Sequence, residues 1–406
     1  MKNSGVEWIG EIPEGWEVSK IFWLIDFING YAFDGSSLSL DLDVPVIRIG
    51  NISNNKIDYE SCLLYKEDKM LEEYSPSEGD ILIAMSGATT GKIGIATNRK
   101  AYINQRVGII RSVYNFLLKY YFQLLAFDEY IKLLSAGSAQ PNISMKQIQD
   151  FIIPLPPKAT QQKIASYLDS KCSKIEETIQ NQQQVIEKLK DYKQSLITEA
   201  VTGKIKIQNG KSCGKYEEYK DSGVEWIGKI PSGWNQIKAK YFIKISNGSD
   251  PKTEEGDTPV YGSGAESFKT CVEFKEGPTV LIGRKGATLH IPHYIVCNYW
   301  NVDTAFDVKT YSEERFLLRF YYYCATAFDY KFYLTSTTLP SMTQTNYGNM
   351  YLPVPNVQIQ KEIVEFLDKK CTAIDNTIEQ KQKLIEKLSE YKKSLIYECV
   401  TGKKAI

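Results

Sequence analysis

Apolar residues recur at helical spacing along two long stretches of this chain. The first, Gln161–Ala200, holds neither proline nor glycine, and its apolar residues recur at helical spacing. The second lies within Val354–Lys403, which aligns without a gap to Leu155–Lys204, with about half of the positions identical. The pattern predicts two related helices of about 40 residues, each about 60 Å long.

The apolar stripe on each predicted helix is narrow and the other faces are charged, which is typical of a coiled-coil strand rather than of a buried core helix. The nearest available partner for each helix is the other copy in the same chain. Pseudo-two-fold pairing of a duplicated unit favours an antiparallel pair over a parallel one. The predicted seam residues are Leu168, Ile175, Ile179, Ile186, Leu189, Leu196, Leu367, Ile374, Ile378, Ile385, Leu388 and Leu395.

A polar residue interrupts this seam at the same place in each helix, Gln182 in the first and Lys381 in the second. One interpretation is that the two residues fix the register of the pair at some cost in stability. The other is that they lie at the edge of the seam with their polar ends in water. The sequence leaves both interpretations open.

The duplication extends beyond the helices. The segment Ser4–Trp16 returns as Ser222–Trp234, and both helical stretches follow a proline-containing segment and end in Val-Thr-Gly-Lys, where Gly203 and Gly402 are placed to stop a helix. The predicted organisation is a first domain over 1–154, a helix in 155–204, a polar linker over 205–221, a second domain over 222–353 and a second helix in 354–406.

Two divergent inserts, roughly 19–153 and 235–353, separate the shared segments. Strands are predicted at Val44–Ile49, Asp80–Ala84, Val107–Ile110 and Thr279–Ile282. Weak sequence similarity remains between two pairs of short segments in the inserts: Gly79–Thr89 resembles Gly277–Thr288, and Gln140–Ser144 resembles Leu339–Thr343. One scaffold carrying two divergent inserts predicts two related but different binding surfaces.

Aromatic and aliphatic residues at helical spacing predict buried helices over Phe116–Leu134 and Glu313–Phe328. We interpret the aromatic runs Tyr120–Phe122 and Phe320–Cys324 as core. The alternative is a base-stacking platform, but such platforms usually interleave aromatic with basic residues on exposed strands.

The formal net charge is zero, from 49 basic and 49 acidic residues, so overall electrostatics do not point to a polyanion. The distribution does. No carboxylate occurs between Asp80 and Asp128, where Lys92, Arg99, Lys100, Arg106, Arg111 and Lys119 lie, and none occurs between Glu276 and Asp303. These two basic windows are typical of nucleic-acid footprints, or else they are buried strands in which all charges are scarce.

Loops after the glycine-marked strands are the candidate DNA contacts, because small residues, hydroxyls and cations there suit a phosphate backbone or a base edge. Arginine can read guanine with two hydrogen bonds, and Asn or Gln can read adenine. The candidates are Arg48, Asn51, Ser86, Thr89, Thr90, Lys92, Asn104, Gln105, Arg106, Ser263, Arg284, Lys285, Thr288, His290 and Asn301.

Several catalytic and metal chemistries are disfavoured. Gly87–Lys92 looks like a phosphate-binding loop but has three residues between its glycines and Ile93 where a hydroxyl should bind Mg²⁺. The two histidines, His290 and His293, flank Pro292 with no cysteine pair nearby, which makes a poor zinc site. Eight scattered cysteines without CxxC spacing are typical of a reducing cytosol, and no apolar run is long enough to span a membrane. Together with the weak phosphate-binding and zinc motifs, these features predict a soluble, cytoplasmic protein with no metal and no catalytic site.

The chain resembles the specificity subunits of type I restriction-modification enzymes. The resemblance is carried by the Ser-Gly-Val-Glu-Trp-Ile-Gly opening segments, the Ile153–Asp169 run, the long helices and the Val-Thr-Gly-Lys ends. It implies an α+β fold in which two α/β target-recognition domains are separated by two long antiparallel helices that form an intramolecular coiled coil. Gln360–Ile363, where paired glutamines are usual, and the lack of a third proline after Pro355 depart slightly from the pattern.

The resemblance also implies a role. A specificity subunit has no catalytic activity of its own, reads an asymmetric bipartite target in double-stranded DNA and docks two methyltransferase subunits for adenine-N6 methylation. Restriction subunits join in the full complex of this bacterial defence system. This chain would bind no cofactor, and S-adenosylmethionine, ATP and Mg²⁺ would belong to the partner subunits.

Two other hypotheses compete with this one. A coiled-coil adaptor without DNA specificity would also explain the helices and the zero net charge. A recognition subunit of a methylation-only or differently assembled system would share all the features above. Sequence-specific DNA binding would rule out the first alternative. The neighbouring genes would decide between the second alternative and a type I system.

Overall fold

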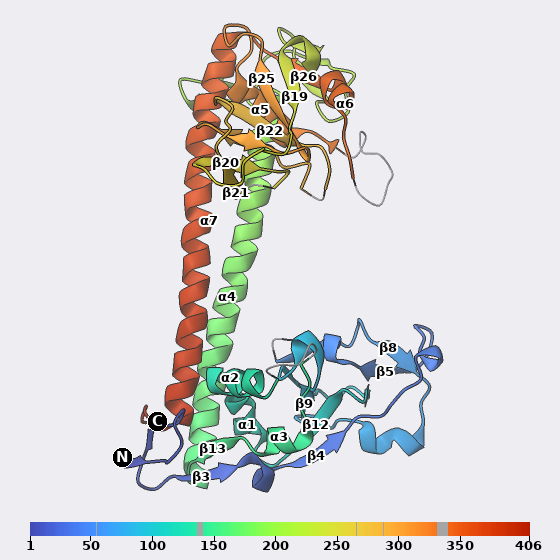
Figure 1. Ribbon diagram of the computed structural model, residues 1–406, viewed down its shortest axis with the longest axis vertical. Coiled ribbons are helices and arrows are strands. Elements are labelled where there is room, and N and C mark those ends of the chain that lie inside the picture. Colours follow the sequence, from blue (N-terminus) through green and yellow to red (C-terminus); the bar gives the residue numbers. More distant parts are fainter. Residues whose placement is uncertain (54, 136–140, 265, 287, 331–339) are drawn as a thin grey trace. The chain divides into compact units, whose positions relative to one another are not determined.

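A computed structural model describes residues 1–53, 55–135, 141–264, 266–286, 288–330 and 340–406 (Figure 1). The chain forms two compact units. Unit 1 comprises Met1–Asn181 and Lys383–Ile406, and unit 2 comprises Gln182–Gln382. Because both boundaries fall inside the long helices, each unit contains one half of each helix.

Unit 1 is built around a four-stranded antiparallel sheet in the order β10-β9-β12-β4 and a three-stranded sheet in the order β11-β5-β8. In the smaller sheet β11 and β5 run parallel. Its strands are β1 Lys2–Asn3, β2 Glu11–Ile12, β3 Glu17–Lys20, β4 Asp26–Asn29, β5 Val44–Ile47, β6 Ile52–Ser53, β7 Lys56–Ile57, β8 Leu63–Tyr65, β9 Ile81–Ala84, β10 Ile93–Ile95, β11 Tyr102–Ile103, β12 Val107–Arg111 and β13 Ile152–Leu155. Its short helices are α1 Asn115–Tyr121, α2 Leu125–Leu134 and α3 Met145–Gln149.

Unit 2 repeats this topology although its insert hardly resembles the first in sequence. The four-stranded sheet has the order β23-β22-β25-β19 and the three-stranded sheet the order β24-β20-β21, again with one parallel pair. Its strands are β14 Ile207–Gln208, β15 Lys211–Ser212, β16 Tyr219–Asp221, β17 Lys229–Pro231, β18 Asn235–Lys238, β19 Ile243–Asn247, β20 Thr258–Tyr261, β21 Ser267–Cys271, β22 Thr279–Gly283, β23 His293–Ile295, β24 Trp300–Asn301, β25 Ala305–Thr310 and β26 Tyr351–Val354. Its short helices are α5 Leu318–Ala327 and α6 Gln344–Asn349.

The predicted helix over Phe116–Leu134 is in fact two helices, α1 and α2. The side-chain amide of Gln123 donates to the carbonyl of Lys119 at 2.7 Å and satisfies a group at the end of α1, so the chain can turn before α2 begins. The helix predicted from Glu313 begins only at Leu318, because the carboxylate of Glu313 accepts the backbone amide of Leu318 at 3.1 Å and caps its first turn.

The aromatic runs belong to the core. Tyr120, Tyr121 and Phe122 in unit 1 and Phe320, Tyr321, Tyr323 and Cys324 in unit 2 are buried, while Tyr322 is half-buried. The hydroxyl of Tyr121 donates to the carbonyl of Pro154 at 2.5 Å and lies 3.2 Å from the carbonyl of Val400. These rings fasten each sheet to the long helices and are not available for stacking on bases.

The two long helices are α4, Lys158–Val201, and α7, Val357–Val400. Each ends at a glycine with positive φ, +70° at Gly203 and +72° at Gly402, as predicted. The strand before each long helix ends inside the proline-containing segment, β13 at Leu155 before Pro156 and β26 at Val354 before Pro355. Pro154 lies within β13 and Pro353 within β26, where two-stranded pairing leaves the missing amide without a cost.

Inside each unit the two helix halves pack antiparallel, and the predicted seam residues are buried or half-buried. Symmetry-equivalent ion pairs cross the seam. Lys392 contacts Glu176 at 2.5 Å in unit 1, and Lys193 contacts Asp375 at 2.7 Å in unit 2. Also in unit 2, the ammonium of Lys381 donates to the side-chain carbonyl of Gln182 at 2.8 Å, so the two polar interruptions bind each other.

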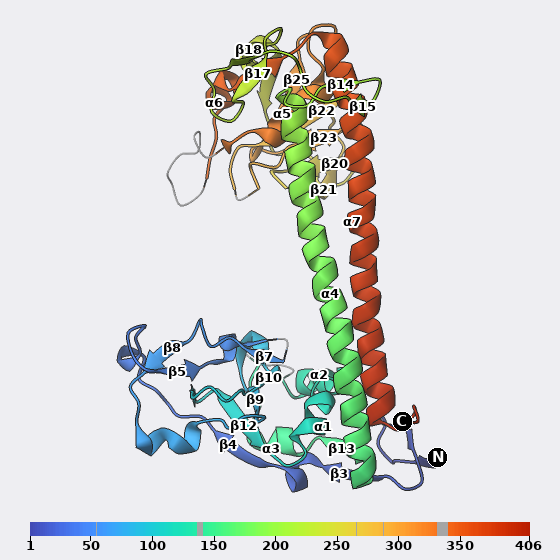
Figure 2. The ribbon, with the colours of Figure 1, turned by 180° about the vertical axis from the view of Figure 1, so that it is seen from behind.

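The region predicted as a polar linker has regular structure. Residues Ile207–Ser212 form the hairpin β14–β15, whose turn residues Asn209 and Gly210 both have positive φ (Figure 2). Figure 2 shows the hairpin next to α7 of unit 2. Ile207 is buried, which gives the hairpin an anchor in the core. Among the described residues, no helix is both long and apolar enough to cross a lipid bilayer.

Candidate nucleic-acid interface

Four loops converge at one edge of unit 1: the segments after β5 and β9, the turn between β11 and β12, and the segment just before α3. The hydroxyl of Thr89 donates to the carbonyl of Ile49 at 3.0 Å, which joins the first two loops. The amide of Met85 donates to the carbonyl of Arg106 at 2.9 Å, and the amide of Gly87 donates to that of Pro141 at 2.9 Å. We call this group the unit 1 loop cluster.

Unit 2 builds the equivalent cluster with different side chains. The amide of Arg284 donates to the carbonyl of Thr304 at 2.8 Å, and the amide of Gly286 donates to that of Pro340 at 3.1 Å. The hydroxyl of Thr288 lies 3.3 Å from that of Ser263. The same backbone frame therefore carries different polar groups in the two units.

The structure thus brings most of the predicted loop residues together, within each unit. It also brings in the segments 141–143 and 340–342, which we had not nominated. The weak sequence similarity between Gln140–Ser144 and Leu339–Thr343 was the available signal, although Gln140 and Leu339 themselves lie outside the described residues.

Two predicted base readers are corrected by the structure. Asn301 is fully buried, and its amide donates to the carbonyl of Ala305 at 2.8 Å while its oxygen accepts from Lys275. Asn51 is also buried, and its oxygen accepts the amide of Arg48 at 2.9 Å. Both side chains hold their loops in shape and have no free face for a base.

Several hydroxyls and one cation play the same structural part. Thr89 holds the neighbouring loop, and the hydroxyl of Thr90 donates to the carbonyl of Gly87 at 2.6 Å. The ammonium of Lys92 lies 3.5 Å from the carboxylate of Asp128, and Lys92 lines a hollow together with residues of the two long helices. Ser86 is buried, and its hydroxyl has no partner among the described residues.

The first basic window is less available to DNA than its sequence indicates, because acids from elsewhere in unit 1 neutralise it. Five of its six cations have a carboxylate within 4.0 Å. The pairs are Lys92–Asp128, Arg99–Glu60, Lys100 with Glu67 and Glu72, Arg111–Asp80 and Lys119–Asp169. Only for Arg106 is no such carboxylate found within the described part of the chain.

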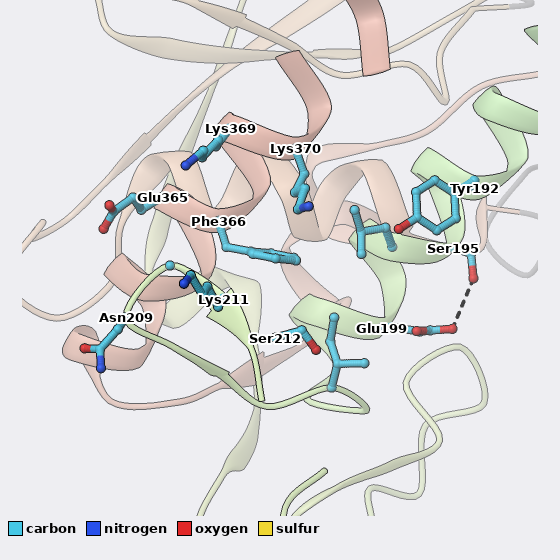
Figure 3. Close-up of a pocket in the computed structure, with 13 residues that line it drawn as sticks. Tyr192, Ser195, Glu199, Asn209, Lys211, Ser212, Glu365, Phe366, Lys369 and Lys370 are labelled. Carbon is cyan, nitrogen blue, oxygen red and sulfur yellow. Dashed lines mark hydrogen bonds between the residues drawn. The ribbon is translucent and has the colours of Figure 1, made fainter. Parts of the chain in front are cut away.

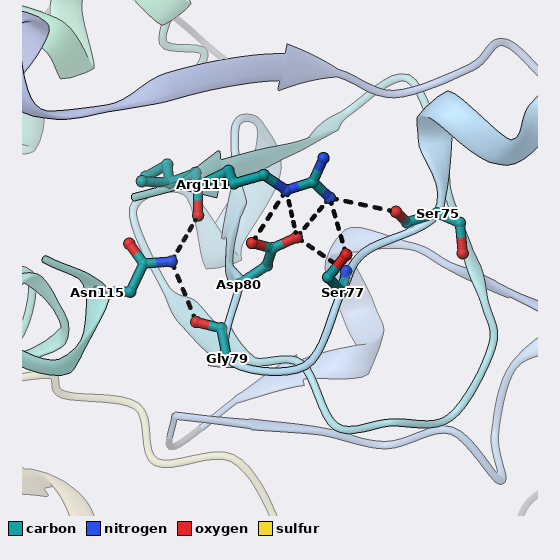
Figure 4. A network of polar contacts seen from close by, with 7 residues as sticks. Ser75, Ser77, Gly79, Asp80, Arg111 and Asn115 are labelled. Atoms are coloured by element: carbon teal, nitrogen blue, oxygen red, sulfur yellow. Dashed lines mark hydrogen bonds and ion pairs between the residues drawn. The ribbon is translucent and has the colours of Figure 1, made fainter. Parts of the chain in front are cut away.

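The pair between Arg111 and Asp80 lies at the centre of a polar network (Figure 4). The Asp80 side chain is only 5% exposed and accepts from Arg111 at 2.6 Å and from the amide of Ser77 at 2.8 Å. Figure 4 shows the guanidinium reaching over Asp80 toward the Ser75 and Ser77 loop. This arginine stabilises the fold, and the carboxylate raises its pKa above the usual value.

Nine of the fifteen candidates remain with an exposed or partly exposed polar end. In unit 1, Gln105 and Arg106 are exposed, Asn104 is half-buried, and Arg48 is half-buried with one guanidinium nitrogen that has no partner in the described residues. In unit 2, Lys285 and His290 are exposed, and Arg284, Thr288 and Ser263 are half-buried. Partial burial lowers the pKa of His293.

A separate hollow of about 770 Å³ lies in unit 2 between the β14–β15 hairpin and the two long helices (Figure 3). Lys211, Lys369 and Lys370 line it together with Glu199 and Glu365. The mixed charges and open shape do not point to one ligand. No group of three or more His, Cys, Asp or Glu side chains that could hold a metal ion was found within the described ranges.

Comparisons with known proteins agree with this geometry. Residues 13–190 and 231–390 match the family described as "Type I restriction modification DNA specificity domain". The putative type I restriction enzyme MjaX specificity subunit of Methanocaldococcus jannaschii is 25% identical, over 97% of this chain and 95% of that protein. The EcoKI specificity subunit of Escherichia coli K12 is 26% identical over 48% of this chain, a match that spans 44% of that subunit.

Fold similarity is established independently of sequence. A chain solved in a study titled "Structural basis underlying complex assembly and conformational transition of the type I R-M system" superposes with a TM-score of 0.70. The match covers 96% of this chain and 98% of the other at 13% sequence identity. Two matched domains, the shared fold and the duplicated helices lead to one assignment: the chain belongs to the type I restriction-modification DNA specificity family, whose members are non-catalytic recognition subunits.

Proposed function

We propose that this chain reads an asymmetric, bipartite target in double-stranded DNA, with one loop cluster for each half-site. The observation that carries the proposal is that both units share one sheet topology and one backbone frame at the loops while the exposed side chains differ. Two readers with the same frame and different polar groups fit two half-sites of different sequence.

The partners follow from the same proposal. Two copies of a methyltransferase subunit would dock on the duplicated scaffold, one for each half, and methylate adenine at N6. S-adenosylmethionine would be bound by those subunits, and ATP and Mg²⁺ by restriction subunits in the full complex. This chain itself would contribute recognition and spacing, without a cofactor and without a catalytic group, and would act in the cytoplasm.

In this proposal the paired helices set the distance between the half-sites. Each helix is continuous over 44 residues, and interhelical ion pairs occur in both units. A continuous helix rises about 1.5 Å per residue and cannot be shortened without removing whole turns. We therefore expect a spacer of fixed length and unspecified sequence.

The test is selection from a pool of random DNA duplexes with the purified full-length chain, followed by methylation of the selected duplexes in the presence of its cognate methyltransferase subunit. We expect two short conserved blocks at a fixed separation, with salt-dependent binding and methylation only when the partner is present. Binding without sequence preference would instead identify a coiled-coil adaptor. Methylation by the chain alone would contradict a non-catalytic role.

A further inference from the structure

Arg106 in unit 1 and Arg284 in unit 2 have no carboxylate partner among the described residues, and they stand on opposite sides of one backbone hydrogen bond. In unit 1 the amide of Met85 donates to the carbonyl of Arg106 at 2.9 Å. In unit 2 the amide of Arg284 donates to the carbonyl of Thr304 at 2.8 Å. Since Met85 follows β9 and Arg284 follows the equivalent strand β22, Arg106 corresponds to Thr304.

Further hydrogen bonds confirm this correspondence. The amide of Ile143 donates to the carbonyl of Met85 at 2.9 Å, just as the amide of Met342 donates to that of Arg284 at 2.9 Å. In the next turn the amide of Gly87 donates to the carbonyl of Pro141 in unit 1, and the amide of Gly286 donates to that of Pro340 in unit 2. The guanidinium is therefore carried by one loop in unit 1 and by the hydrogen-bonded neighbouring loop in unit 2, while the backbone frame is the same.

Neither arginine is held by an acid. Arg106 is exposed, and within the described ranges no carboxylate lies at ion-pair distance from it or from Arg284. Arg284 is half-buried, with its guanidinium 5.9 Å from the centre of the Phe306 ring and 3.4 Å from the carbonyl of Asp303. These contacts orient the side chain without neutralising it. Arg99 and Arg111, by contrast, are paired with acids in unit 1.

We propose that Arg106 and Arg284 are the guanine readers of the two half-sites, one in each unit, which rests on the proposed DNA-recognition function. A guanidinium fork donates two parallel hydrogen bonds to O6 and N7 of guanine in the major groove. An arginine already paired with a carboxylate would first have to break that pair. Arg48 also has no carboxylate at ion-pair distance among the described residues, but its partnerless guanidinium nitrogen is buried. Arg106 and Arg284, on hydrogen-bonded neighbouring loops of one shared backbone frame, are therefore the arginines prepared for this contact.

The experiment compares duplex selection by the full-length chain and by two variants, Arg106→Gln and Arg284→Gln. Glutamine removes the charge and the guanidinium fork, and its amide suits adenine. We expect each variant to lose about tenfold in preference for guanine at one position of one half-site, with a shift toward adenine there. The other half-site should keep its wild-type preference, which also shows that the variant is folded.

Arg99→Gln is the matched control, because Arg99 lies in the same basic window but is paired with Glu60. Its selected motif should equal that of the wild type. The proposal is overturned if Arg106→Gln and Arg284→Gln select the wild-type motif, or if they weaken binding to all sequences alike, as loss of a phosphate contact would. If the wild type selects no motif at all, the proposed function itself has failed.

A transplant separates position from mere charge. The double variant Arg284→Met with Thr304→Arg gives unit 2 the arrangement of unit 1, with the guanidinium on the neighbouring loop. We expect it to regain part of the guanine preference that Arg284→Gln loses in that half-site. A double variant that shows no more guanine preference than Arg284→Gln would contradict the inference that a guanidinium on either of these neighbouring positions reads the same half-site.

Discussion

The ammonium of Lys381 donates a 2.8 Å hydrogen bond to the side-chain oxygen of Gln182, and this bond joins the two polar interruptions of the helix seam. Both residues are half-buried, so the pair replaces apolar contacts where the helices meet in unit 2. Of the two interpretations that the sequence left open, direct pairing of the interruptions favours the one in which they fix the register.

Replacing both residues with leucine should therefore stabilise the helix pair and weaken its register. We expect the double variant Gln182→Leu with Lys381→Leu to raise the free energy of unfolding by roughly 1 to 2 kcal/mol, because two desolvated polar groups give way to apolar packing. Urea unfolding followed by helical circular dichroism measures the change. Gln184→Leu, at an exposed helix position, is the control and should change little. A clear loss of stability in the double variant would show that the polar pair is net stabilising.

Arg111 is predicted to matter for stability and not for DNA sequence. Arg111→Leu leaves the buried carboxylate of Asp80 without its ion-pair partner and should destabilise unit 1 by about 3 kcal/mol. Arg99→Leu, which breaks an exposed pair, should cost at most about 1 kcal/mol. Denaturant unfolding compares the two. If Arg111→Leu changed the selected DNA motif without altering stability, Arg111 would instead be a DNA contact.

The glycine that ends α4 should tolerate no side chain. A Cβ on Gly203 would lie 2.6 Å from Pro231 Cδ and 3.0 Å from the Trp234 ring, in addition to the cost of φ +70°. We expect Gly203→Ala to destabilise unit 2 by roughly 2 to 3 kcal/mol, measured by urea unfolding. Gly228→Ala is the matched control, since Gly228 has φ +67° and a Cβ added there would meet nothing within 4 Å, and it should cost about 1 kcal/mol. Equal losses would mean that the steric contact with Pro231 is unimportant.

The buried tyrosines predict a loss of stability at alkaline pH. Burial, together with a hydrogen bond to Asp169, raises the pKa of Tyr120, and burial together with a hydrogen bond to Asp368 raises the pKa of Tyr323. Above about pH 10 the unfolded chain releases these protons while the folded chain keeps them, so stability is complete below that pH and declines as pH rises. Tyrosinate absorbance and helical signal should change together. Ionisation of these tyrosines in a chain that remains folded would contradict their burial.

Shortening both helices should shorten the DNA spacer. Removing seven residues from each helix keeps the heptad register and takes about 10 Å from the helix pair, or about three base pairs of duplex. We expect selection from random duplexes to return the same half-sites at this smaller separation. Removing seven residues from one helix only is the control and should break the seam. An unchanged spacer with the symmetric deletion would mean that the helices do not set it.

The sequence alone determined the duplication, the two long helices with their glycine stops, and the burial of the aromatic runs. These features follow from local rules, because helical periodicity, missing proline and glycine, and apolar runs act over a few neighbouring residues. The break at Gln123 and the cap by Glu313 depend on single side-chain hydrogen bonds, and periodicity does not report them.

Only the tertiary structure decided which polar residues are free to bind. A window without acids in the sequence is neutralised in space by Glu60, Asp80 and other carboxylates from distant segments, since ion pairs form between neighbours in three dimensions. The same folding buries Asn51 and Asn301 and leaves Arg106 and Arg284 unpaired at neighbouring, hydrogen-bonded positions of one shared loop frame. The sequence contains both arginines, but their places on either side of one shared backbone hydrogen bond appear only when the strands beside them are paired.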